Sequence, residues 1–528
     1  MSEKRTFIKG AAILSISGIV VKLLGAALRI PLSNKIGAGM AYYNVAYTIY
    51  AIFLVLATAG IPVAISRLVS ERISMGNGKG AHKVFTTALK LMLAIGLASS
   101  AICYFGAGAI SEIIKIPDAE ISLKAIAPAL CIVPMLSAFR GYFQGRQNMK
   151  PTAFSEIGEQ VVRVAVGLGL GFFLFEQGLD VAAAGATFGA FAGALVGILI
   201  ITVIYLVDVG KREAGLARMS GVEEPQGRIL KKIAWIAIPI IIGAEIMPIM
   251  SAIDTSIIVA RLQATGWSAD AALDLYSQYG AYCDTLISLP QTFTQAIAVS
   301  LVPSIAAFFW QRKIDSVNAN IKVSMRLTMI MACPCAVGLF VLARPILTML
   351  YPAQLESAVA AVPTLRVMTV GVVLLAISQT TTGALQSIDR QMNPVKNLAI
   401  GACAKVVITY ILVGVPAVNV KGAAVGTNAA YLVALLLNMR SVKKCTGVKF
   451  DVILTYVKPM AASLIMGVCV YASYILLLGY TAGYVATIGS ILAGIAVYGV
   501  TIIRLGAISV EELKPIPFGE FMVKLFRL

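Results

Sequence analysis

The chain has 528 residues, of which 59% are hydrophobic and only 13% are charged. An ordinary soluble domain carries about 25% charged residues, so the composition excludes that class and predicts an integral membrane protein. The formal net charge of +18 would suggest a nucleic-acid partner in a soluble chain. In a membrane protein, the distribution of lysine and arginine between the spans has to be considered first.

Apolar segments long enough to cross a bilayer as a helix, about 20 residues, recur along the whole chain. We therefore expect an all-α polytopic membrane protein with fourteen transmembrane helices. The predicted spans are residues 9–31, 42–66, 84–110, 122–143, 154–176, 181–206, 233–260, 277–309, 324–350, 359–386, 397–416, 422–439, 452–478 and 484–503.

Lysine and arginine gather in every second connection between these spans, for example at residues 67–83, 140–150 and 440–449. The alternate connections contain few positive charges beyond Lys35, Lys115, Arg261 and Lys421. The positive-inside rule then places both termini in the cytoplasm and favours an even number of spans. Because this topology accounts for much of the net charge, we expect no nucleic-acid partner and a multi-pass membrane protein.

One segment in the first half of the chain recurs in the second half. The shared positions are Gly141, Gln144, Pro151, Ile157 and Gly158 in the first copy and Gly383, Gln386, Pro394, Ile400 and Gly401 in the second. Six predicted helices separate the copies, an even number, so we expect two six-helix lobes related by a pseudo-two-fold axis along the membrane normal. The predicted division is an N-terminal lobe at 1–228, a C-terminal lobe at 229–440, and two extra helices with a cytoplasmic tail at 441–528.

The predicted span at 181–206 has a glycine at every fourth position, namely Gly185, Gly189, Gly193 and Gly197. Such a stripe of small residues lets the backbone of a neighbouring helix approach closely. We interpret it as a packing surface rather than a ligand site.

Ionisable side chains inside a span must face protein or water, because placing one in hydrocarbon costs about 3 kcal/mol or more. Lys22 and Arg29 are seven residues apart on one face of the first span, where we predict a substrate cavity. The alternative is that they extend to opposite membrane surfaces as anchors. Glu159 and Arg163 form an i, i+4 pair, which is either purely structural or brings Arg163 to the cavity with Glu159 in support.

The seventh predicted span carries two acidic residues, Glu245 and Asp254, and Arg261 follows Asp254 by seven residues on the same face. Lys405 lies near the repeat-equivalent position of Arg163. We predict that Asp254, Arg261 and Lys405 also line the cavity, with Glu245 in a supporting role. Many transporters use a duplicated bundle to build a site that opens alternately to each side of the membrane, and in such a cycle we expect Asp254 to exchange cationic partners between the two states.

A cavity bearing these lysines and arginines would favour an anion, since guanidinium groups suit phosphate oxygens, and a pyrophosphate head group fits this description. The sequence has no Gly-x-x-x-x-Gly-Lys-Ser/Thr nucleotide loop. Cys333-Pro-Cys335 is similar to the copper site of heavy-metal pumps but lacks their ATPase segments. We therefore expect no enzymatic activity, no cofactor and no bound metal.

Several motifs together resemble the stage V sporulation protein B family of polysaccharide exporters. They are Lys22-x-x-Gly25-x-x-x-Arg29-x-Pro31-Leu32, Gly37-x-Gly39, Tyr47, Thr58-Ala59-Gly60-Ile61-Pro62, Ser66-x-Leu68-Val69-Ser70-Glu71, Arg140-Gly-Tyr-Phe-Gln-Gly145, Pro151-Thr152, Glu159-Gln160 and Arg163, together with Asp254, Arg261, Pro290 and Lys405. The resemblance covers nearly the whole chain. It departs from the lipid II flippase branch at Leu28, where a second arginine of the first span would be expected.

This resemblance implies membership of the multidrug/oligosaccharidyl-lipid/polysaccharide flippase superfamily, with a central cavity between two lobes. The implied function is a flippase for an undecaprenyl-pyrophosphate-linked cell-wall oligosaccharide similar to lipid II, acting as a monomer among membrane lipids. One alternative is a cation-coupled multidrug exporter on the same fold, which would favour an acidic cavity. The other is a non-transporting scaffold for envelope or spore assembly, which would need no charged cavity.

Overall fold

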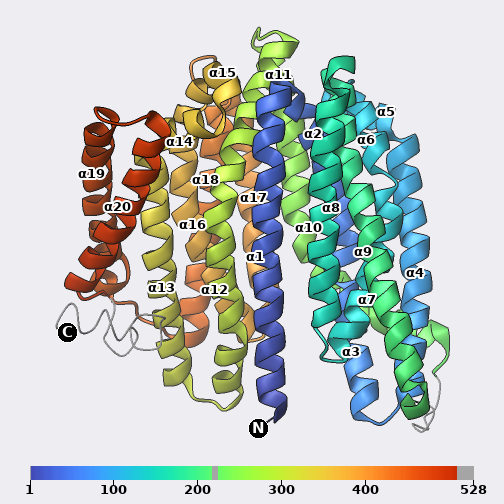
Figure 1. Ribbon diagram of the computed structural model, residues 1–528. Helices are drawn as coiled ribbons and strands as arrows, with labels where there is room; N and C mark the ends of the chain where they lie inside the picture. The colour runs from blue at the N-terminus through green and yellow to red at the C-terminus, as the bar shows by residue number, and fades with distance from the viewer. Residues whose placement is uncertain (1, 217–223, 508–528) are drawn as a thin grey trace. The chain divides into compact units, whose positions relative to one another are not determined.

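The computed structural model describes residues 2–216 and 224–507 and consists, over those residues, of helices joined by short connections (Figure 1). Its contacts divide the chain into two compact units, Met1–Ala281 and Tyr282–Leu528. The helices of the first unit are α1 (Ser2–Ile36), η1 (Gly37–Gly39), α2 (Met40–Thr58), α3 (Ile61–Ser74), α4 (Gly78–Phe105), α5 (Ala107–Ile114), α6 (Ala119–Ile126), α7 (Ala129–Gly145), α8 (Lys150–Phe173), η2 (Leu174–Gln177), α9 (Leu179–Leu216), α10 (Gln226–Ala264) and α11 (Ala269–Ser277).

A π-helical turn, η3 (Gln278–Cys283), leads into the helices of the second unit. These are α12 (Asp284–Trp310), α13 (Ile314–Val341), α14 (Ala343–Leu350), η4 (Pro352–Gln354), α15 (Leu355–Ala360), α16 (Val362–Ser387), α17 (Met392–Val413), α18 (Lys421–Thr446), η5 (Ile453–Val457), α19 (Lys458–Leu478) and α20 (Gly483–Arg504).

All fourteen predicted spans fall on helices, so the predicted all-α membrane fold is confirmed. Among the described residues, twelve helical segments are long and apolar enough to cross a membrane. One of them, Ser17–Ser74, is 58 residues long and contains the predicted span 42–66 together with most of the predicted span 9–31. The count of fourteen stays a prediction.

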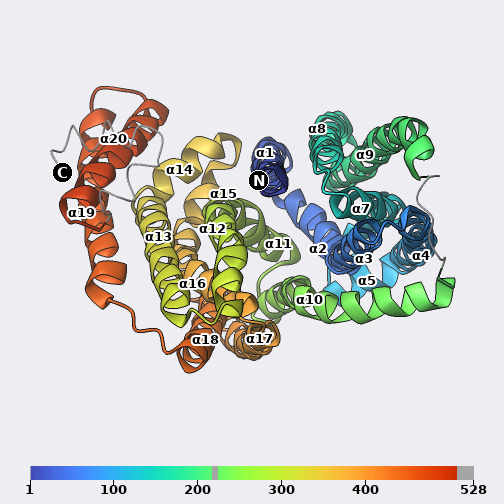
Figure 2. The ribbon, with the colours of Figure 1, turned by 90° about the horizontal axis from the view of Figure 1, so that it is seen from below.

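The same packing pattern occurs in both units. In the first, α7 is central and packs against α3, α4 and α9, while α8 packs against α9 (Figure 2). In the second, α16 packs against α12, α13 and α18, while α17 packs against α18. Because α7 to α9 and α16 to α18 carry the two copies of the sequence repeat, this pattern supports an internal duplication.

Repeat-equivalent glycines lie at equivalent helix contacts. A Cβ atom added to Gly141 of α7 would lie 2.8 Å from the Pro62 carbonyl oxygen of α3. A Cβ atom added to Gly383 of α16 would lie 2.7 Å from the Ala298 carbonyl oxygen of α12. Both contacts exclude any side chain larger than hydrogen, which explains why the repeat preserves glycine there.

The contact-based units do not follow the boundary at residue 228, because α10 packs against α2, α3 and α4 of the first unit. The division at 1–228, 229–440 and 441–528 rests on the repeat and remains a prediction. The two last helices, α19 and α20, pack against each other and against α13. Within this contact, the Tyr498 hydroxyl of α20 donates a hydrogen bond of 2.6 Å to the Ile330 carbonyl of α13.

Candidate functional site

The glycine stripe of α9 packs against α8, as predicted, and thereby positions the charged residues of α8. A Cβ atom added to Gly193 would lie 2.5 Å from the Glu159 carbonyl oxygen, and one added to Gly189 would lie 2.6 Å from the Arg163 carbonyl oxygen. The two backbones are therefore as close as helices can approach. This contact fixes the place at which the side chains of Glu159 and Arg163 leave α8.

Glu159 lies between two guanidinium groups. It accepts hydrogen bonds from Arg163 at 2.5 Å and from Arg140 of α7 at 2.9 Å. Arg140 also donates to the Ser155 hydroxyl at 3.1 Å. All three charged side chains are 13–15% exposed. The predicted Glu159–Arg163 pair is confirmed, but the intrahelical pair is only part of a network that also ties α7 to α8.

Arg163 has hydrogen-bonding capacity left over. Its Nε atom is buried and has no hydrogen-bond partner among the described residues. The buried hydroxyls of Tyr47 and Tyr50 on α2 likewise make no hydrogen bond of ordinary geometry there. These hydroxyls lie close enough to Arg163 to interact electrostatically, although not in hydrogen-bond geometry. Buried polar atoms of this kind are normally satisfied by water or by a ligand.

The tyrosines near Arg163 form a ladder along α2. The rings of Tyr43 and Tyr47 are stacked with centroids 4.5 Å apart, and Tyr47 meets Tyr50 edge-on at 5.8 Å. Tyr43 lies within electrostatic range of both Arg29 and Arg163. The ladder therefore lies between two predicted site residues, Arg29 of α1 and Arg163 of α8.

The α1 helix also contacts α8 directly, because the Ser17 hydroxyl donates a hydrogen bond of 3.1 Å to Glu156 of α8. Arg29 is half-buried, whereas Lys22 is exposed on the helix surface. The structure thus places Arg29 beside the α8 network. A common role for Lys22 and Arg29 remains a prediction.

Asp254 of α10 is 5% exposed, so it does not face lipid. Its neighbour Thr255 shares a hydrogen bond of 2.8 Å with the Tyr276 hydroxyl of α11. Tyr276 lies in the electrostatic field of both Asp254 and Arg29. One tyrosine of α11 therefore brings the acidic region of α10 and the basic region of α1 together within the first unit.

The other predicted residues of α10 have different surroundings. Glu245 is 9% exposed, and its carboxylate lies beside the Leu56 backbone of α2. Arg261 is half-buried in the last turn of α10, where a positive charge interacts favourably with the helix dipole.

Lys405 of α17, 6% exposed, belongs to the second unit. It lies at the α17–α18 contact, since a Cβ atom added to Gly426 would be 3.2 Å from its carbonyl oxygen. Arg163 occupies the corresponding α8–α9 contact in the first unit, as the repeat predicts. That Lys405 shares a cavity with the cations of the first unit remains a prediction.

Sequence reasoning missed three contributors to this region. Arg140 was counted among the positive charges of a connection, although it lies inside α7 and binds Glu159. Tyr47 was named only within the family resemblance and was given no role, and Tyr43, Tyr50 and Tyr276 were not singled out. The one available signal was the spacing of Tyr43, Tyr47 and Tyr50, which places them on one helical face.

Residues 7–309 match the model of a protein family described as "Polysaccharide biosynthesis protein". Two relatives from Bacillus subtilis (strain 168) are each 27% identical to this chain. "Lipid II flippase MurJ" aligns over 89% of this chain and 88% of its own length. "Stage V sporulation protein B" aligns over 99% of this chain and 100% of its own length.

The fold is similar to those of solved membrane transporters. A structure of "Lipid II flippase MurJ, inward closed conformation" matches with a TM-score of 0.70 and 17% identity, over 92% of this chain and 97% of that chain. An inward-facing multidrug resistance MATE family transporter matches with a TM-score of 0.68 and 15% identity, over 83% and 98%. At these identities the similarity establishes the shared fold.

Proposed function

This chain belongs to the polysaccharide biosynthesis protein family, and we propose that it is a flippase for an undecaprenyl-pyrophosphate-linked cell-wall oligosaccharide similar to lipid II. Its relatives and structural neighbours are flippases and transporters rather than enzymes. The chain is accordingly a multi-pass membrane protein. Translocation by alternating access would carry the head group from the cytoplasmic to the outer leaflet.

The observation that carries this proposal is the buried basic region around Arg163. Burying guanidinium groups in a membrane-spanning unit is costly, and here Glu159 pairs with both Arg140 and Arg163 while Glu156 lies within electrostatic range of Arg140. The Nε atom of Arg163 adds a donor without a partner among the described residues, and the hydroxyls of Tyr47 and Tyr50 lie near this guanidinium. A pyrophosphate could accept hydrogen bonds from such donors, and tyrosine rings suit contact with a sugar or lipid.

In this proposal Lys22 and Arg29 receive the anionic head group, together with Arg163, Arg261 and Lys405. Asp254, close to Tyr276 and the field of Arg29, competes with the anion for the same cations. Such competition lets substrate binding release Asp254 to another partner, which supplies a two-state element for alternating access.

The test is replacement of Lys22 and Arg29 by glutamine in a strain that depends on this protein. We expect loss of complementation at normal membrane abundance, and accumulation of the lipid-linked precursor on depletion would identify the glycan. The matched control is Lys35→Gln, since Lys35 ends the same helix but lies 4.3 Å over the Phe175 ring, away from the basic region. Normal growth of the double variant would show that Lys22 and Arg29 do not bind the substrate and serve as membrane anchors instead.

Glu245 favours a second candidate function, a cation-coupled exporter of small organic molecules. A carboxylate buried in a membrane-spanning helix holds a proton or attracts a cation. If this candidate holds, depletion should raise the cellular content of a cationic dye without accumulation of a lipid-linked precursor. Glu245→Gln should then abolish the ion dependence of dye export, whereas unchanged dye content on depletion would reject this function.

A further inference from the structure

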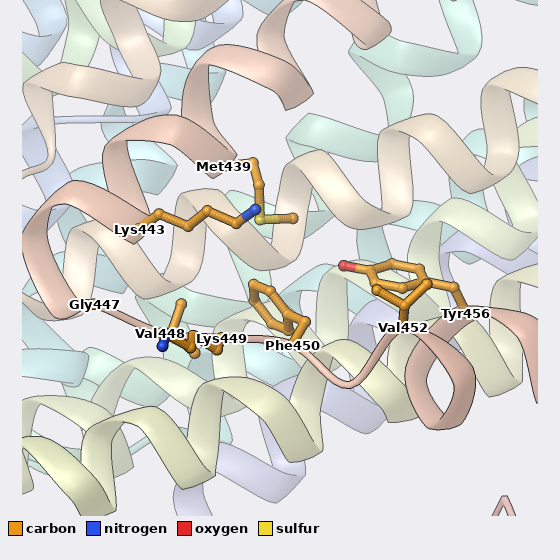
Figure 3. Close-up of a pocket in the computed structure, with 8 residues that line it drawn as sticks. All are labelled: Met439, Lys443, Gly447, Val448, Lys449, Phe450, Val452 and Tyr456. Atoms are coloured by element: carbon orange, nitrogen blue, oxygen red, sulfur yellow. The ribbon is translucent and has the colours of Figure 1, made fainter.

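A pocket of about 450 Å³ lies where α18 ends and η5 leads into α19, in the second unit. Its lining residues are Met439, Lys443, Gly447, Val448, Lys449, Phe450, Val452 and Tyr456 (Figure 3). Both flanking helices are candidate membrane spans, Lys421–Thr446 and Ile453–Leu478. The pocket therefore lies at the level where a membrane span meets the lipid head groups.

The pocket has two chemically different parts. Lys443 and Lys449 supply ammonium groups on exposed side chains, and Figure 3 shows Lys443 extended across the pocket toward Met439. Phe450 and Tyr456 supply aromatic surface, with ring centroids 6.4 Å apart, and Met439 adds a thioether. Phe450, Tyr456 and Met439 also pack against Met325 and its buried neighbours, so the apolar part is continuous with the core of the unit.

Within the part of the chain that the structure describes, neither Lys443 nor Lys449 has a carboxylate partner at ion-pair distance. Asp451 is the acidic residue in the connection, and its carboxylate accepts the Leu454 backbone N–H at 2.9 Å. The carbonyl groups at the end of α18 are also occupied, since the Gly447 N–H donates to Lys443 and the Asn318 side chain donates to Thr446. The lysines thus remain available to an external anion.

Beyond the lysines, the rim of the pocket is apolar and open. Val452, which lines the pocket, is 61% exposed, and Ile453, the next residue in the chain, is 64% exposed. A free inorganic anion would gain nothing from these side chains. A phosphate that carries hydrocarbon chains would use both parts of the site, because its head group would meet the lysines while its chains contact the apolar rim.

We propose that this pocket binds the phosphate head group of an anionic phospholipid. The predicted topology places it at the cytoplasmic surface, where anionic lipids are concentrated. A lipid held there would bridge α18 and the start of α19. The proposal is independent of the transported substrate, since none of its residues belongs to the predicted cavity.

The test measures lipid binding to the purified full-length protein by native mass spectrometry. Phosphatidylglycerol, phosphatidylcholine and inorganic phosphate are the three probes. We expect phosphatidylglycerol to bind more tightly than phosphatidylcholine. Each lysine removed should weaken that binding about fivefold, and the Lys443→Gln/Lys449→Gln variant should weaken it about 30-fold.

Two control variants separate charge at the pocket from charge in general. Lys444→Gln removes an exposed lysine outside the pocket lining and should leave phosphatidylglycerol affinity unchanged. Lys443→Arg/Lys449→Arg retains both charges and should retain most of the affinity. Three results would overturn the proposal: unchanged affinity in the double glutamine variant, equal affinity for the two lipids, or inorganic phosphate binding as tightly as phosphatidylglycerol.

Discussion

Replacing Gly193 of α9 by alanine tests whether the α8–α9 contact positions the basic region. The new Cβ atom would lie 2.5 Å from the Glu159 carbonyl oxygen and 3.0 Å from the Arg163 Cβ atom. Ordinary contacts begin at 3.4 Å, so α9 would have to move away by about 0.9 Å. Backbone atoms of α8 cannot rotate out of the way as a flexible side chain could.

Two opposing effects determine how much Gly193→Ala changes the free energy of unfolding. Overpacking a well-fitted contact costs about 1–3 kcal/mol, while replacing a helical glycine by alanine gains up to about 1 kcal/mol. Gly169 of α8 provides the matched control, because it is exposed and a Cβ atom there meets nothing within 4 Å. We therefore expect Gly193→Ala to be less stable than Gly169→Ala by about 1–3 kcal/mol.

The assay is unfolding of both purified variants by titration with sodium dodecyl sulfate in mixed micelles, combined with complementation at matched abundance. Gly193→Ala should also reduce complementation, since moving α9 displaces Glu159 and Arg163. Equal stability of the two variants, or full activity of Gly193→Ala, would show that the contact is looser than described and that the site does not depend on it.

Three further predictions follow from the ion pairs and the charge distribution. Glu159→Gln leaves Arg140 and Arg163 without their shared carboxylate and should destabilise the protein by about 3–5 kcal/mol. The control Glu112→Gln changes an exposed carboxylate and should cost less than about 0.5 kcal/mol. Equal unfolding free energies of the two variants would contradict this prediction. The Lys232 hydrogen bond and the Arg72 guanidinium lower the pKa of the Glu224 carboxyl from its ordinary 4.5. The stabilisation of the folded protein by Glu224 should therefore be complete above pH 4.5 and should disappear as the pH falls through the lower folded-state pKa. A stability difference between Glu224→Gln and the parent that stayed constant from pH 7 to pH 3 would refute it. Reporter fusions after Lys35, Glu176 and Gly479 should report the outside and those after Lys79, Lys211 and Lys443 the cytoplasm, and inversion at two sites would reject the predicted topology.

The sequence was sufficient for features that depend on one helix or on the repeat. Apolar length located the helices, and i, i+4 spacing identified the Glu159–Arg163 pair and the packing face of α9. The sequence could not show that Arg140 of α7 reaches Glu159 of α8, because that contact depends on how the two helices are rotated against each other. The proximity of Tyr276 to Asp254 and Arg29 likewise arises from the packing of α10 and α11 against other helices.

The hydrogen bond from Tyr498 gives the last two helices a role in completing the backbone of α13. Pro334 lies four residues after Ile330 in α13 and has no N–H, so the Ile330 carbonyl loses the partner that an unbroken helix would provide. The Tyr498 hydroxyl replaces that missing donor from α20. A shortened chain without α20 would leave a bare carbonyl within the bilayer, so these helices are an integral part of the bundle despite lying outside the duplication.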